Sequence, residues 1–171
     1  MEFWQNTIGP YEGRLEDLDS ATLTGLALHV IERTVPLFEP PFEELFPAEY
    51  ATLIASAVPV RGHSLAHRPI DDALARNFLA GYDVLPEVPI RPAVGPFMMA
   101  LVRLFEAAEG SVSAYDTLAI LWSCYEAVLM SQLSGRIAED DEKANPCCRR
   151  AIALQEEAVL DRLRAGSAPP S

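Results

Sequence analysis

Residues 113–133 read SAYDTLAILWSCYEAVLMSQL, and the part from Thr117 to Met130 is apolar nearly all round a helix. This run has 14 residues and contains Glu126, whereas a helix that crosses a membrane needs about 20 residues. A helix with apolar side chains on every face belongs in the middle of a bundle. We therefore expect a buried central helix from Ser113 to about Leu133, capped by Ser111 or Ser113.

The segments on both sides of this run also show helical periodicity. From about Pro96 to Ala108 the apolar residues form a single stripe, and Arg103 projects away from it. After the central helix, Asn145-Pro146 supplies a cap and a proline at the first helical position, which predicts a last helix to about Arg164. Three earlier helices are predicted. They run from Asp19 or Ser20 to Pro36, from about Pro47 to Ala57, and from Ile70 to Ala80 with Gly81 as its C-terminal stop.

The fold class predicted from these segments is all-α. No alternating run of β-branched residues is long enough for a strand, and 171 residues suit one domain of roughly 100–200 residues. We predict a single-domain helical bundle of six or seven helices over residues 1–165, followed by a flexible tail at residues 166–171. The proline-rich residues 82–96 are interpreted as a loop inside this domain.

Composition restricts the partners. The chain has 25 Asp and Glu against 13 Lys and Arg, a net charge of 13 − 25 = −12, and it is half hydrophobic. High hydrophobicity excludes intrinsic disorder, and a strong negative field argues against binding nucleic acid or a membrane surface. Three cysteines form no disulfide framework, and the first residues lack the features of a signal peptide. We therefore expect a soluble cytoplasmic protein.

Three groups of residues occur in an order that is typical of one family. They are Tyr11-Glu12-x-Arg14-Leu15 with Glu32-Arg33-x-x-Pro36, then Arg91-Pro92-Ala93-Val94, and finally Asp141-Glu142-x-x-Asn145-Pro146. In these segments the chain resembles the YjaG-like family, domain of unknown function family 416, while residues 37–90 show little of the pattern. The resemblance implies a small bacterial all-helical protein. It carries over no catalytic residue, because the function of that family is unassigned.

Glu126 is a candidate pocket residue. It is the only charged residue between Asp116 and Arg136, and it projects beside Trp122. A carboxylate in that setting either reaches the edge of the bundle, or is paired, hydrogen-bonded or shifted to a higher pKa. Arg76 or Arg91 are its candidate partners, so we take Glu126, Trp122 and Arg91 as a candidate pocket.

Acidic residues gather in two places, between Glu39 and Glu49 and at Glu139, Asp140, Asp141 and Glu142. Such clusters are either a solvated face that keeps the protein soluble or a docking surface for a basic partner. We take Glu139, Asp140, Asp141 and Glu142 as the candidate interaction surface.

Neither the histidines nor the cysteines predict a metal, cofactor or nucleophile site. His63 and His67 have the i, i+4 spacing of metal ligands, but no zincin glutamate accompanies them and Arg61 and Arg68 flank them. Cys147 and Cys148 are adjacent, so we expect free thiols. Helical phase places Cys147 outward and Cys148 inward.

The function predicted is therefore that of a non-catalytic protein-interaction or regulatory module, which neutralises a basic partner such as a toxin. It rests on the charge and on the lack of a phosphate-binding loop, a dinucleotide fingerprint or a nucleophile elbow. Two alternatives stay open. One is a ligand-binding protein or enzyme with an inter-helix pocket around Glu126, and the other is a homodimer joined through the apolar central helices.

Overall fold

The computed structural model describes residues 2–57 and 70–166, in which every regular element is helical. Six helices have ten or more residues: α3 (Ser20–Thr34), α5 (Ala48–Ala57), α6 (Asp72–Asp83), α7 (Val94–Ala108), α8 (Ala114–Gln132) and α10 (Pro146–Gly166). Four are shorter: α1 (Glu2–Thr7), α2 (Glu12–Leu15), α4 (Phe42–Leu45) and α9 (Glu139–Ala144). The all-α class is confirmed, and the short elements take the helix number slightly above the prediction.

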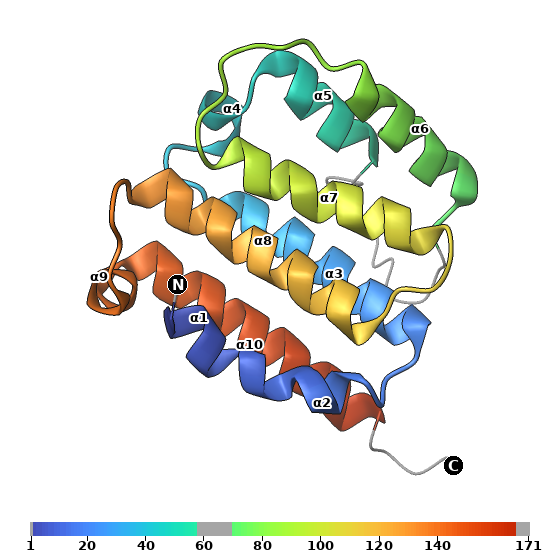
Figure 1. Cartoon of the computed structure of the whole chain (residues 1–171), viewed down its shortest axis with the longest axis vertical. Helices are drawn as coiled ribbons and strands as arrows, with labels where there is room; N and C mark the ends of the chain where they lie inside the picture. Colours follow the sequence, from blue (N-terminus) through green and yellow to red (C-terminus); the bar gives the residue numbers. More distant parts are fainter. Residues whose placement is uncertain (1, 58–69, 167–171) are drawn as a thin grey trace.

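Helix α8 is at the centre of the bundle. It packs against α7 on one side and against α3 and α10 on the other (Figure 1). Because neighbours cover most of its circumference, apolar side chains on several faces are fully buried, among them Ile120, Leu121 and Val128. Phe105 of α7 and Ile152 of α10 belong to the same core, so the prediction of one shared interior is confirmed.

Local capping chemistry sets where several helices begin. At α8, Ser113 Oγ accepts from the backbone N–H of Asp116, and the Asp116 carboxylate accepts from the N–H of Ser113, a reciprocal capping box. At α10, Asn145 Oδ1 accepts from the N–H groups of Cys147 and Cys148. Of the alternative caps considered, Asp19 caps α3, through a 2.7 Å bond from Thr22 N–H.

Two shorter layers flank the centre. Helices α5 and α6 form a hairpin that packs on α7, while α1 and α9 lie beside α10 at the opposite side of the molecule (Figure 1). The stretch Val84–Ala93 connects α6 to α7 as a loop, as predicted for most of residues 82–96. No helix in the described part of the chain is long and apolar enough to cross a membrane.

Several helix boundaries differ from the predictions. Helices α2 and α4 were not predicted, α6 begins at Asp72 and not at Ile70, and α7 begins at Val94 and not at Pro96. Helix α1 was not predicted, and it buries Trp4. Helix α6 continues past Gly81 to Asp83, because Gly81 serves close packing rather than termination: a Cβ there would lie 2.7 Å from Cδ1 of Leu53 on α5. Helix α10 reaches Gly166, and the rest of the predicted tail, residues 167–171, lies outside the described residues.

Candidate functional site

A groove is lined by residues of α5, of the end of α6 and the loop after it, and of the start of α7. These elements lie in the upper part of Figure 1. The groove encloses about 350 Å³. Its lining combines aromatic, aliphatic and acidic residues and contains no Lys or Arg: Tyr50, Tyr82, Asp83, Leu85, Pro86, Glu87, Ile90, Gly95 and Met98.

The loop after α6 forms one wall of this groove. Its prolines, Pro86, Pro89 and Pro92, lack the N–H that a helix needs, so the chain stays extended between α6 and α7. The loop is attached to α5 by a hydrogen bond of 3.4 Å, in which Tyr50 Oη donates to the Pro86 carbonyl. This hydrogen bond thus holds the loop after α6 next to the start of α5.

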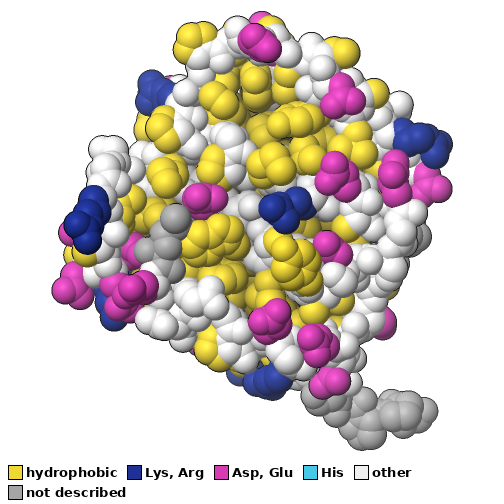
Figure 2. All heavy atoms as spheres, in the orientation of Figure 1, with side chains coloured by type: hydrophobic (Ala, Val, Ile, Leu, Met, Phe, Trp, Pro, Cys, Tyr) yellow, Lys and Arg dark blue, Asp and Glu magenta, His cyan; other side chains and the backbone are white. Residues whose placement is uncertain are grey.

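This loop and the start of α7 expose an unusual share of apolar surface. Of the five large hydrophobic side chains that are exposed in the described residues, four lie here, and Val84 is 79% exposed. Figure 2 shows hydrophobic side chains gathered over α5, α6 and α7, with acidic and some basic side chains around them. The four residues are Val84, Val88, Ile90 and Met99. Apolar surface left open in this way is typical of an interaction site.

An acidic segment, Glu39–Glu49, approaches the same groove. Its four glutamates, Glu39, Glu43, Glu44 and Glu49, are all exposed, and it contains no basic residue. Aromatic contacts hold it in place: Phe46 of the segment and Phe38, the residue just before it, each lie edge-on to Phe97 of α7, with ring centroids 5.5 and 5.3 Å from that of Phe97. The next residue after the segment, Tyr50, lines the groove.

The arginines predicted as partners of Glu126 do not pair with it. Glu126 is half-buried on α8, where burial raises its pKa, but no ion pair joins it to Arg91 or Arg76, which are both exposed. Trp122 instead packs edge-on against Trp4, with ring centroids 5.2 Å apart. None of Glu126, Trp122 and Arg91 lines the groove, although Arg91 directly follows the lining residue Ile90.

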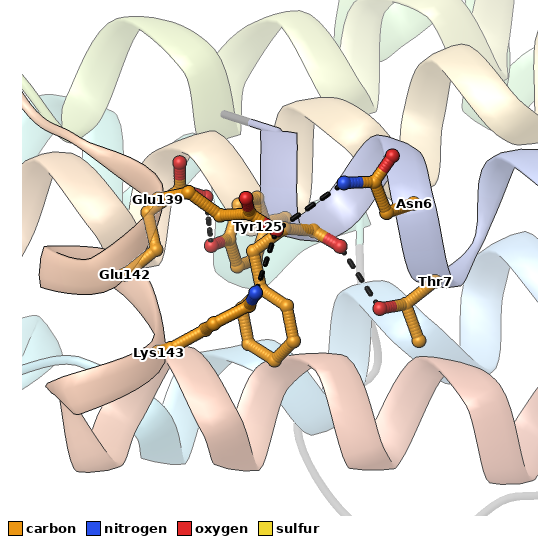
Figure 3. A network of polar contacts seen from close by, with 7 residues as sticks. Asn6, Thr7, Tyr125, Glu139, Glu142 and Lys143 are labelled. Carbon is orange, nitrogen blue, oxygen red and sulfur yellow. Dashed lines mark hydrogen bonds and ion pairs between the residues drawn. The ribbon is translucent and has the colours of Figure 1, made fainter.

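The predicted acidic interaction surface needs a correction, because Glu142 is buried, with none of its surface exposed. Its Oε2 accepts a 2.6 Å hydrogen bond from the Tyr125 hydroxyl of α8 (Figure 3). Glu142 therefore fastens α9 to α8 and cannot meet a partner at the surface.

The other three acidic residues of this group differ in the contacts that they make. Glu139 pairs with Lys143 at 2.8 Å and accepts from Asn6 Nδ2 at 3.2 Å, which attaches α9 to α1 (Figure 3). These two contacts lower the pKa of Glu139. Asp141 caps α9 through the Ala138 N–H, and Asp140 is exposed. Most of this acidic group thus holds α9 in place.

The cysteines also depart from the prediction. Cys148 points inward as expected, but the outward placement of Cys147 is wrong, since its side chain is only 4% exposed. Burial raises the pKa of the Cys147 thiol, with a further contribution from the nearby Glu39 carboxylate. Burial also raises the pKa of Cys148 to about 11 and that of Cys124 to about 12. All three residues are free cysteines.

We expect all three thiols to react slowly with a thiol-labelling reagent in the native protein at pH 8. The reagent needs an exposed thiolate, and burial removes access while the raised pKa values keep the groups protonated. Native labelling should be slower than labelling in denaturant by more than about tenfold. If Cys147 reacts in the native protein as fast as in denaturant, while Cys124 and Cys148 react slowly, the Cys147 side chain points outward as first predicted.

No group of three or more His, Cys, Asp or Glu in residues 2–57 and 70–166 is placed to hold a metal ion. The histidine pair considered from spacing, His63 and His67, lies outside the described residues. Comparison of the chain with protein-family models, with curated proteins and with solved structures finds no match. The resemblance to the YjaG-like family stays a prediction, and function has to be inferred from the chain's own residues.

Sequence reasoning missed the groove residues Tyr50, Tyr82 and Ile90. They come from three segments separated along the chain, and each looks ordinary in its own segment. A weak signal was present in residues 84–90, where Val84, Val88 and Ile90 are large apolar residues in a proline-rich connection. Connections in compact domains are usually polar, so apolar residues there indicate either burial or binding.

Proposed function

We propose that this protein is a non-catalytic binding module that recognises a basic protein partner through acidic side chains around the Tyr50 groove. The observation that carries the proposal is the meeting of two acidic segments that are separate in sequence. The Tyr50–Pro86 hydrogen bond joins the residue that follows Glu39–Glu49 to the loop that carries Glu87, and this loop directly follows Asp83 at the end of α6. Glu39–Glu49 contains no Lys or Arg, and the loop carries one basic residue, Arg91, which is exposed and does not line the groove.

Internal ion pairs leave most of the negative charge unneutralised. All 25 acidic residues fall within the described ranges, which contain 11 of the 13 basic residues, because Arg61 and Arg68 are outside them. Within those ranges, Lys143–Glu139 and Arg164–Asp161 are the ion pairs between Lys or Arg and a carboxylate. Unneutralised charge of one sign steers an oppositely charged partner and speeds association.

The acidic segment is also ordered by contacts within the protein itself. Phe42 stacks on Phe46 with ring centroids 4.4 Å apart, and Gln132 Nε2 of α8 donates to the Glu39 carbonyl at 2.7 Å. A segment that is already ordered loses less conformational entropy when it binds. This order supports a role in recognition over a role in solubility alone.

Affinity capture from an extract of the source cells tests the proposal. Wild-type protein should retain a basic protein at low salt and release it at about 0.5 M salt, where charges are strongly screened. The acidic variant Glu43→Gln/Glu44→Gln/Glu49→Gln should lose that protein. The matched control Glu12→Gln/Glu16→Gln/Asp17→Asn changes the charge equally at exposed positions of another region and should retain it. Equal loss in both variants would contradict a specific acidic site.

A further inference from the structure

We propose that the Tyr50 groove binds an amphipathic basic segment of the partner, with an apolar side chain inserted between Tyr50, Tyr82 and Ile90 and with Lys or Arg beside Asp83 and Glu87. This inference rests on the proposed function and deepens it, since it names the chemistry of the occupant. It depends on three features of the groove: its apolar floor, its acidic rim and the exposure of its apolar wall.

The floor suits an apolar side chain. Met98 of α7 is buried beneath the groove, and Leu85 and Pro86 form its loop side. A volume of about 350 Å³ holds a few side chains but not a whole helix. Ile90 lines the groove and is exposed, and the exposed Val88 lies in the same loop, directly after the lining residue Glu87. An occupant that covers both would remove their apolar surface from water.

The rim determines the charge of the occupant. Asp83 and Glu87 are the charged residues of the lining, and Glu49 is the neighbour of Tyr50 in sequence. The exposed Arg91 follows Ile90 in sequence but does not line the groove. A second copy of this chain would place the same carboxylates opposite one another, and like charges at close range are unfavourable. An anionic ligand meets the same repulsion. A segment with Lys or Arg is complementary to these carboxylates.

The two tyrosines fit the same occupant. An aromatic face binds an aliphatic side chain by area burial and also attracts an Arg or Lys above the ring. Tyrosine is enriched among the residues that dominate protein–protein affinity because it buries large area with few rotatable bonds. Tyr50 and Tyr82 are both half-buried and both line the groove, so part of each side chain stays accessible to an occupant.

Binding of two synthetic peptides of equal charge tests the inference. One peptide combines Lys with Leu on one face, and the other replaces each Leu by Ser. We expect wild-type protein to bind the Lys/Leu peptide at least about tenfold more tightly than the Lys/Ser peptide, by fluorescence anisotropy at fixed salt. The groove variant Val88→Ser/Ile90→Ser should remove this preference. The control Tyr115→Ser, an exposed residue at the start of α8, should keep it.

Charge variants separate the contribution of the acidic rim to peptide affinity from that of the apolar floor. Asp83→Asn/Glu87→Gln should weaken both peptides and reduce the salt dependence of binding, whereas Glu106→Gln/Glu109→Gln, at exposed positions near the end of α7, should not. If the two peptides bind with equal affinity and the groove variant has no effect, the inference that the groove binds an apolar side chain is wrong. The proposed binding of a basic partner would still stand. Binding of neither peptide above an uncharged Ser peptide would overturn both.

Sedimentation of the protein alone tests the competing occupant. We expect wild-type protein and Val88→Ser/Ile90→Ser to sediment identically as monomers. A wild-type dimer that becomes monomeric in this variant would show that a second copy fills the groove, and would overturn the inference of a basic segment.

Discussion

Replacing Phe97 by alanine is expected to destabilise the protein by about 3–5 kcal/mol, the range for removing a large buried aromatic side chain. Phe97 is completely buried on α7, and its ring meets Phe38 and Phe46 at 5.3 and 5.5 Å. The substitution leaves a cavity between α7 and the acidic segment, and it also removes both edge-on ring contacts. Urea unfolding followed by circular dichroism measures the loss.

Met99→Ala is the matched control on the same helix, since Met99 is exposed. It should change the free energy of unfolding by less than about 1 kcal/mol. Hydrogen exchange adds a second readout under conditions where Phe97→Ala is still folded. Amides near Phe38–Leu45 should exchange faster, while those in the middle of α10 should not. A variant as stable as the Met99 control would show that Phe97 does not anchor the segment.

The parts of the fold that could be predicted are those specified by contacts close in sequence. Ser113 and Asp116 form a capping box across a single turn, and Asn145 caps the two residues that follow Pro146. The periodic apolar residues of α7 place Phe105 inward and Arg103 outward, as the structure confirms. Periods of 3.6 residues determine which face is buried once a helix has a single packed side.

The errors arise where a residue's environment comes from a distant segment. Four consecutive acids at residues 139–142 predict a solvated face, yet Glu142 is buried because Tyr125, 17 residues earlier, reaches it with a hydroxyl. Cys147 should point outward by the phase of α10 alone. It is buried because the start of α10 is also covered on a second side, where Glu39 approaches. A helical-wheel projection of one helix shows neither Tyr125 beside Glu142 nor Glu39 beside Cys147.

The candidate site shows the same division. The charge of Glu39–Glu49 is visible in the sequence, and so is the proline-rich connection. Their meeting is not visible, because it depends on the α5–α6 hairpin folding back on α7 and on the Tyr50–Pro86 hydrogen bond. A groove made from three segments has no pattern within any one of them, which explains why Tyr50 and Tyr82 attracted no functional interpretation.

Helix α1 is the clearest test of such long-range contacts, because six residues are too short to form a stable helix alone. Trp4 is nearly completely buried and packs on Trp122. Its indole N–H donates to Gln155 Oε1 at 2.7 Å, across 151 residues of sequence, and Gln155 donates in turn to the Leu121 carbonyl at 2.8 Å. Tertiary contacts, those of Trp4 above all and the Asn6–Glu139 hydrogen bond beside them, thus account for the order of α1.

Trp4→Ala should therefore cost about 3–5 kcal/mol of stability and detach α1, which increases proteolysis and hydrogen exchange within residues 2–7. Trp4→Phe keeps most of the packing but leaves Gln155 Oε1 without its donor, so it should cost about 1–3 kcal/mol. Gln5→Ala, at an exposed position of the same helix, should be nearly neutral. If all three variants unfold at the same urea concentration, α1 contributes nothing to the core. A loss for Trp4→Ala that Trp4→Phe fully restores would assign the effect to packing alone.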